Sequence, residues 1–218
     1  MQPAPENKQP KELIPADNYM ATCTEMIFVG TIEEEFQGEK KLMPKIRLTW
    51  EIPSLTKVFK EEKGPQPLVI SKKFTYSMGD KATLKKFLDN WRGKAMTPEE
   101  SKKFVPTVLL GKPCMLNVIH RTSEASGNVY QDVGSASKLP SGIPAPPQIN
   151  PSREFDVREF NKEMFDTFPE WLQTEIKSSA EYKAQFSDVA PAPSPSPATA
   201  PPQTETPASK PKVSETAL

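Results

Sequence analysis

The stretch that decides the fold is LVISKKFTYSMGDKATLKKFLDNW, residues 68–91. Its first half is rich in β-branched and aromatic side chains, which predicts a strand over residues 68–78. In its second half the apolar residues follow helical spacing (i, i+3, i+4, i+7) and form one stripe: Leu84, Phe87, Leu88 and Trp91. Asp80 is the expected N-cap of this helix, and Gly93 is its expected stop. A strand therefore leads directly into a helix.

Two strands are predicted before this point. Residues 19–32 are β-branched and aromatic and contain no proline, and residues 42–52 alternate after Pro44. The alternation puts apolar side chains on one face, namely Ile46, Leu48, Trp50 and Ile52. It puts polar side chains on the opposite face, namely Lys45, Arg47, Thr49 and Glu51. A charged turn (33–41) and a loop (53–67) are expected around the second strand.

Two further strands are predicted after the helix. A second short helix begins with a capping box, Thr97-Pro98-Glu99-Glu100. Strands over residues 113–121 and 129–136 follow, joined by a turn at 126–128. The order of three strands, a helix and two strands is that of a mainly β fold, the OB-fold: a five-stranded Greek-key barrel with its helix between strands three and four. An open α+β sheet with both helices on one face is the competing topology.

The chain has 25 prolines among its 218 residues, and clusters of them mark the boundaries between its parts. Segments rich in proline and poor in aromatic residues do not bury enough apolar surface to fold. The expected parts are a flexible N-terminal arm (1–16), an OB-fold-like domain (17–142), a Pro-rich linker (143–151), an acidic helical appendage (152–188) and a disordered tail (189–218).

The appendage holds nine acidic and five basic residues, a net charge of −4, whereas residues 1–151 carry +4. Its apolar residues from 155 to 168 are near helical spacing, and Pro169 restarts a helix. Because it is too small to fold alone, it packs on the barrel, docks on a partner or folds over the groove of the barrel. With an extended linker, the domain is expected to fold without residues 150–218.

Short phrases along the chain carry a resemblance to a family. These phrases are WRGK (91–94) after a Lys-rich helix, LGKPC (110–114), FPEWL (168–172) and SAEY (179–182). With the strand order, they make residues 17–186 resemble phage-encoded single-stranded DNA-binding proteins of OB-fold type. The resemblance implies sequence-tolerant binding of single-stranded DNA in phage replication or recombination, in the host cytoplasm.

Enzymatic chemistry is not expected. The chain has one histidine, His120, and lacks the GxSxG, HExxH and CxxC motifs and any phosphate-cradling glycine motif. Cys23 and Cys114 are interpreted as small buried hydrophobes, so neither a metal nor a cofactor is predicted. No apolar run reaches the roughly 18 residues of a membrane span, and residues 1–15 show no signal-peptide pattern, so a soluble cytoplasmic protein without a membrane partner is expected.

The distribution of basic residues indicates that the protein binds a polyanion. Single-strand binding needs cations for phosphates and aromatic platforms for bases, and in OB-folds strands two and three with their flanking loops provide them. The predicted contacts are Lys45 and Arg47 on strand two, Lys72 and Lys73 on strand three, and Lys57, Phe59, Lys60 and Lys63 in the loop between them.

The aromatic residues have separate interpretations. Trp50 and Trp91 share faces with apolar residues and are expected in the core. Phe74 and Tyr76 share parity with Ile70 but also with Lys72, so they are either core residues or stacking platforms. Phe59, in a charged loop, is the best candidate for a platform. The alternative function is a non-enzymatic protein-interaction module whose aromatic appendage, residues 152–188, docks partners; replication or recombination proteins are the partners expected there under the first function.

Overall fold

The computed structural model describes residues 12–36 and 38–186. Contacts divide the chain into two units, Met1–Ser187 and Asp188–Leu218, and the described residues all fall in the first. The predicted tail (189–218) and most of the predicted arm (1–11) lie outside the described residues.

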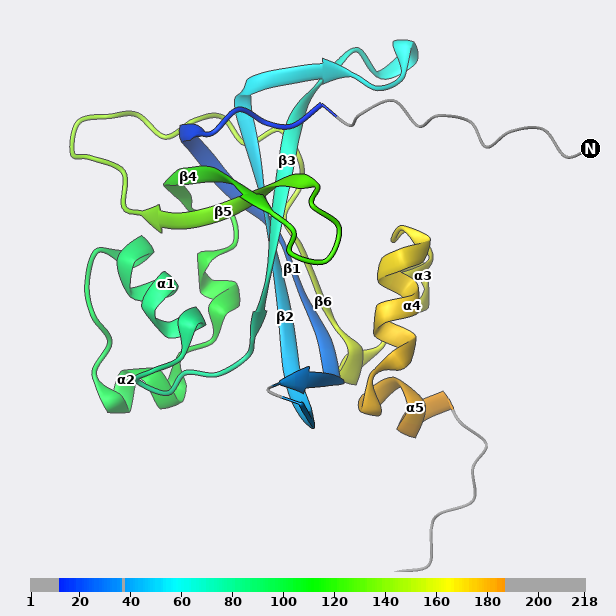
Figure 1. Ribbon diagram of the computed structural model, residues 1–218. Coiled ribbons are helices and arrows are strands. Elements are labelled where there is room, and N and C mark those ends of the chain that lie inside the picture. Colours follow the sequence, from blue (N-terminus) through cyan, green and yellow to red (C-terminus); the bar gives the residue numbers. More distant parts are fainter. Residues whose placement is uncertain (1–11, 37, 187–218) are drawn as a thin grey trace, which may run out of the picture. The chain divides into compact units, whose positions relative to one another are not determined.

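The described part is built on one sheet (Figure 1). Its strands are β1 (Asp17–Phe36), β2 (Glu39–Val58), β3 (Pro65–Thr75), β4 (Pro113–Thr122), β5 (Val129–Ser137) and β6 (Arg153–Asp156). The order is β3-β2-β1-β4-β5 with antiparallel neighbours, and β6 pairs with β1 in parallel. Within the described residues no strand pairing joins β3 to β5, so the sheet is open. The prediction of a mainly β fold is confirmed, whereas closure into a barrel is not observed.

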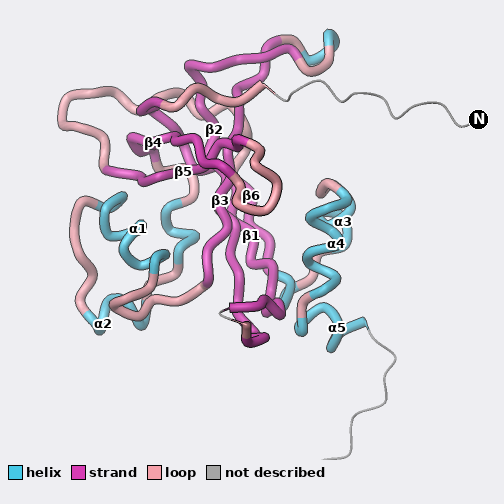
Figure 2. Tube along the Cα trace, viewed as in Figure 1, coloured by secondary structure: helices cyan, strands magenta, loops and turns pink. Residues whose placement is uncertain are grey.

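The helices lie on both sides of this sheet, α1 and α2 on one and α3, α4 and α5 on the other (Figures 1 and 2). Their bounds are α1 (Thr83–Arg92), α2 (Pro98–Lys103), α3 (Lys162–Asp166), α4 (Glu170–Ser178) and α5 (Ala180–Phe186), with 3₁₀ turns η1 (Glu61–Lys63), η2 (Pro106–Leu109) and η3 (Val157–Glu159).

The ends of α1 and α2 follow local sequence rules with one exception. Gly93 ends α1 in the left-handed conformation, φ 67°, as predicted. Thr97 and Glu100 form both hydrogen bonds of the predicted capping box. The N-cap prediction for Asp80 is wrong: the helix starts after Ala82, which offers no side-chain cap.

The main core lies between the sheet and α1. The whole α1 stripe is buried, and so are Ile46, Leu48, Trp50 and Val118. The Trp50 ring centre lies 5.6 Å from that of Phe87. The core predictions for Trp50 and Trp91 are confirmed.

A second core covers the other face of β1. Ile27, Phe28 and Val29 are buried there against the C-terminal segment, which contributes Phe155, Val157, Phe165, Phe168, Leu172 and Ile176. The expectation that the domain is complete without residues 150–218 is therefore revised, because β1 is a central strand with apolar side chains on both faces.

Several boundaries differ from the predictions. Most of the turn expected at 33–41 is strand, because β1 runs to Phe36 and β2 begins at Glu39. Most of the loop expected at 53–67 is strand, because β2 runs to Val58 and β3 begins at Pro65. The first part of the expected helix at 155–168 is instead β6 and η3, since β6 pairs with β1. Residues 12–16 of the expected flexible arm are anchored: Ile14 is buried, its N–H donates to Gln131 Oε1 at 2.7 Å, and its carbonyl lies 2.8 Å from His120 Nε2.

Candidate nucleic-acid interface

The outer face of β2, the one with Lys45 and Arg47, was expected to be solvated. Most of this face is instead buried. Lys45, Thr49 and Glu51 are all buried, with Glu51 at 0 % exposure. The Glu51 carboxylate accepts the backbone N–H groups of Ile149 (2.6 Å) and Asn150 (2.8 Å). Because a buried carboxylate needs such donors, the end of the predicted linker is tied to β2 rather than left loose.

The outer face of β3 remains accessible. Its outward residues Val69, Lys73 and Thr75 are exposed, and Ser71 is half-buried. The accessible part of the predicted interface is therefore β3, the edge strand, and not β2.

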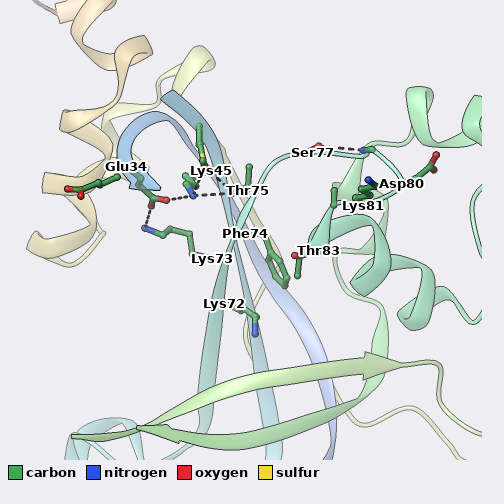
Figure 3. A pocket seen from close by; sticks show the side chains of 14 residues that line it. Glu34, Lys45, Lys72, Lys73, Phe74, Thr75, Ser77, Asp80, Lys81 and Thr83 are labelled. Atoms are coloured by element: carbon green, nitrogen blue, oxygen red, sulfur yellow. Dashed lines mark hydrogen bonds and ion pairs between the residues drawn. The ribbon is translucent and has the colours of Figure 1, made fainter. Parts of the chain in front are cut away.

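A groove of about 910 Å³ lies at the α1 end of β3. It is bounded by the β1–β2 hairpin, by residues 72–75 of β3, and by residues 77–83, which lead into α1 (Figure 3). It brings together three of the predicted phosphate contacts, Lys45, Lys72 and Lys73, and adds a fourth lysine, Lys81. The groove also holds carboxylates, from Glu34, Glu35 and Asp80.

Glu34 organises two of these lysines (Figure 3). Its carboxylate lies 2.5 Å from Lys45 Nζ and 3.2 Å from Lys73 Nζ. Burial raises the pKa of Glu34, but the hydrogen bonds from Lys45 and Lys73 outweigh it and leave the pKa below its ordinary value. Lys45, only 5 % exposed and also bonded to Thr75 Oγ1 at 3.1 Å, is a structural cation and not an exposed phosphate contact.

Lys73 is the more accessible of the two, with 35 % of its side chain exposed. It also pairs with Glu175 of α4, at 2.7 Å. Burial lowers the pKa of Lys73, but hydrogen bonds to Glu175 and Glu34 outweigh it and raise the pKa above its ordinary value. Its ammonium group stays charged and faces the groove.

Lys72 forms a bridge between β3 and β5. Its Nζ donates to both Asp132 carboxylate oxygens, at 3.0 and 3.1 Å, and to the Val133 carbonyl oxygen of β5. Arg121 Nε also donates to Asp132, at 2.8 Å. The three donors of the Lys72 ammonium are thus engaged across the gap between β3 and β5, which argues against a phosphate contact there.

The first turn of α1 also opens on the groove, through Ala82 and Thr83. The unpaired N–H groups of a first helical turn carry partial positive charge. Together with the exposed Lys81, they place positive charge on this wall of the groove, beside the carboxylate of Asp80.

The aromatic residues Phe74, in β3, and Tyr76, just after it, belong to the cores. Phe74 is 4 % exposed, and its ring centre lies 4.9 Å from that of Phe87. Tyr76 is half-buried, packs against both cores and meets Phe28 edge-on at 5.5 Å. The question left open by the sequence is answered in favour of core packing for both residues.

The predicted loop contacts lie elsewhere. The opposite end of the β2–β3 hairpin carries Lys57, Phe59, Lys60 and Lys63. At about 3.3 Å per residue along β3, this end is roughly 30 Å from the groove. Phe59 is 63 % exposed, as a stacking platform requires. Lys57 pairs with Glu12 at 2.7 Å. The structure therefore separates the predicted residues into two groups, joined by the outer face of β3.

One further residue on this face was not among the predicted contacts. Trp171 of α4 lies over Arg47, with its ring centre 4.6 Å from the guanidinium carbon, and it is 53 % exposed. The available signal was its position in α4: Leu172 and Ile176 form the buried stripe of that helix, and Trp171 lies outside it.

Comparisons with family models, with curated proteins and with solved structures found no match for this chain. Among the described helices, none has the length and apolar character that a membrane crossing requires.

Proposed function

We propose that this chain is a single-stranded DNA-binding protein of the partly open OB-fold type, acting in phage replication or recombination in the host cytoplasm. The strand order supports the fold assignment. With β3 and β5 at the two ends of the order, the OB-fold brings these strands together, and the Lys72–Asp132 ion pair spans them. The helix α1 comes between β3 and β4, as that fold requires.

The main support for this function is the groove beside β3. It brings Lys73 of β3 together with Lys81 and the first turn of α1, beside a strand that OB-folds use for oligonucleotides. From the groove, the accessible outer face of β3 leads toward the loop that bears Lys60, Lys63 and Phe59. A single strand lying along β3 would meet cations at both ends.

The ion pairs of the groove fit this function. Glu34 and Glu175 hold Lys73 in place, and a phosphate would compete with them for its ammonium group. Binding of this kind weakens steeply with salt, because counterions are released from the nucleic acid.

The alternative of partner docking through the aromatic appendage has less support. Phe155, Phe165, Phe168, Leu172 and Ile176 are all at most 5 % exposed, because they cover β1. Docking through these five would require their removal from the second core, so the rings of the appendage that are exposed for a partner are those of Trp171 and Phe186.

The test is fluorescence anisotropy with a labelled oligothymidylate and with a duplex of the same length, over a salt series. We expect tighter binding of the single strand and a linear fall of log K with log salt. Lys73→Gln and Lys81→Gln should each reduce the salt slope by about 0.7 for a single strand. Lys112→Gln, an exposed lysine outside the groove, is the matched control and should leave the slope unchanged. Absence of binding at low salt would overturn the proposal.

A further inference from the structure

Trp171 is unusual among the apolar residues of α4 because it takes no part in either core. Leu172 is 3 % and Ile176 is 0 % exposed, so they anchor the helix, whereas Trp171 is 53 % exposed. A large exposed aromatic side chain on a charged face is a common feature of binding sites for stacking ligands.

The ring has a fixed support. The Arg47 guanidinium lies under it at 4.6 Å. One turn further along α4, Glu175 pairs with Lys73, the cross-strand neighbour of Arg47. The two contacts set the position of the helix over β2 and β3, so the ring is oriented before any ligand arrives.

The helix itself is not a displaceable lid. After α4, the Thr31 N–H donates to the Glu181 carboxylate at 2.6 Å, and Ser179 is fully buried. Before α4, Phe168 is buried in the second core. Lifting α4 would expose Ile27 and Val29, so Trp171 is a permanent part of this face.

We infer that Trp171, supported by Arg47, is a stacking platform for a nucleobase. This inference rests on the proposed function. Arg47 and Lys73 are paired in the β2–β3 ladder, so the platform lies beside the cation proposed to bind a phosphate. A base on Trp171 and a phosphate on Lys73 would belong to the same stretch of a strand that follows β3.

The competing explanation is that Arg47 and Trp171 form only a cation–π clamp that attaches α4 to the sheet. Such a pair contributes about 0.5–1 kcal/mol when exposed, and its loss would lower stability without a specific effect on base binding. The two explanations therefore differ in their dependence on the base.

Intrinsic fluorescence reports on Trp171 directly. The chain has three tryptophans, and the other two, Trp50 and Trp91, are 0 % and 3 % exposed. Stacking of a base on Trp171 should quench the accessible part of the emission as oligothymidylate is added. Trp171→Phe should lose this signal while it retains most of the affinity, since a phenyl ring still stacks.

Affinity is measured separately with a labelled oligonucleotide and with an abasic oligonucleotide of the same length, which offers phosphates without bases. Trp171→Ala should weaken binding of the oligothymidylate by about 5- to 150-fold, the range that corresponds to the stacking of one base. It should leave binding of the abasic strand unchanged. Phe186→Ala, which removes a ring of similar exposure from α5, is the control and should leave both affinities unchanged.

The outcomes separate the two proposals. If the oligothymidylate binds wild-type protein without quenching, and Trp171→Ala binds it equally well, the platform is overturned and the proposed function stands. Equal weakening for the normal and abasic strands would also overturn the platform, in favour of a clamp. Absence of binding to any single strand would overturn the proposed function itself, and capture of a protein through Trp171 in that case would indicate a protein partner.

Discussion

Lys72 Nζ on β3 lies 3.0 Å from the carboxylate of Asp132 on β5, across the gap at which the sheet fails to close. Both side chains are less than one-fifth exposed. Lys72 shares its side of β3 with Ile70 and Phe74, which are core residues. Its side chain extends from the core past the unpaired edge of β3. Its ammonium group links β3 to β5, which are not joined by a ladder of backbone hydrogen bonds.

The first prediction concerns this bridge. Lys72→Met keeps the aliphatic stem and removes the ammonium group, which leaves Asp132 and the Val133 carbonyl without that donor. We expect a loss of about 1–3 kcal/mol in the free energy of unfolding, measured by urea denaturation. Lys112→Met, at an exposed position, should change it by less than about 0.5 kcal/mol. If Lys72→Met has wild-type stability but binds DNA more weakly, Lys72 is a phosphate contact and not a structural bridge.

The second prediction concerns Glu34, whose pKa is held below its ordinary value of 4.5 by Lys45 and Lys73 against the opposing effect of burial. The ionised form is favoured in the folded state, so its stabilisation is complete above the ordinary pKa and is lost as pH falls through the lowered one. Glu34→Gln should cost about 1–3 kcal/mol at pH 7, since Lys45 is buried.

The same variant gives a pH profile. The stability difference between wild type and Glu34→Gln should shrink as the pH falls below 4.5, the ordinary pKa, because wild-type Glu34 becomes protonated as the pH passes through its lowered pKa. The control is Glu33→Gln, which breaks an exposed pair with Lys40 and should change stability by less than about 1 kcal/mol. A stability difference that does not vary with pH would show that the ionisation of Glu34 is not the cause.

Much of the fold follows from local sequence rules. The apolar stripe of α1, the Gly93 stop and the Thr97 capping box each depend on a few neighbouring residues, and each was predicted correctly. Trp50 was placed in the core by period-two alternation. Such features need no knowledge of distant contacts.

The errors on the outer face of β2 have a common physical origin: side chains there that look solvated are covered by residues far away in sequence. Glu51 meets the backbone at Ile149, about a hundred positions later, and Arg47 meets Trp171. Alternation predicts which residues share a face but not what covers it. Lys45 was predicted as an exposed cation for a more local reason: alternation along β2 does not show that Glu34, 11 positions earlier on β1, pairs with its buried ammonium group.

The third prediction concerns the C-terminal segment. A chain that ends at residue 149 would expose Ile27 and Val29, each 0 % exposed in the whole protein, and would remove two donors of the buried Glu51 carboxylate. Since burial of a side chain of this size contributes about 1.5–3 kcal/mol, we expect loss of cooperative thermal unfolding. A chain that ends at residue 187, which keeps the whole first unit, should unfold cooperatively. A cooperative transition for the shorter chain would show that the second core is dispensable.

The last prediction tests the docking of α5 at a single position of β1. Gly30 has φ +103° at an irregularity in the β1–β2 pairing, and a Cβ added there would lie 2.6 Å from Ser179 Cβ and 2.7 Å from a Glu181 carboxylate oxygen. Gly30→Ala therefore combines an unfavourable backbone conformation with a clash against a fully buried serine, and we expect a loss of about 2–5 kcal/mol in the free energy of unfolding. Gly38→Ala separates the two effects, because Gly38 also has a positive φ, +79°, but has open space around it, so only the backbone cost of about 1–2 kcal/mol should appear. Urea denaturation of both variants measures the difference, and equal losses would mean that the segment around Ser179 is not packed against β1 in solution.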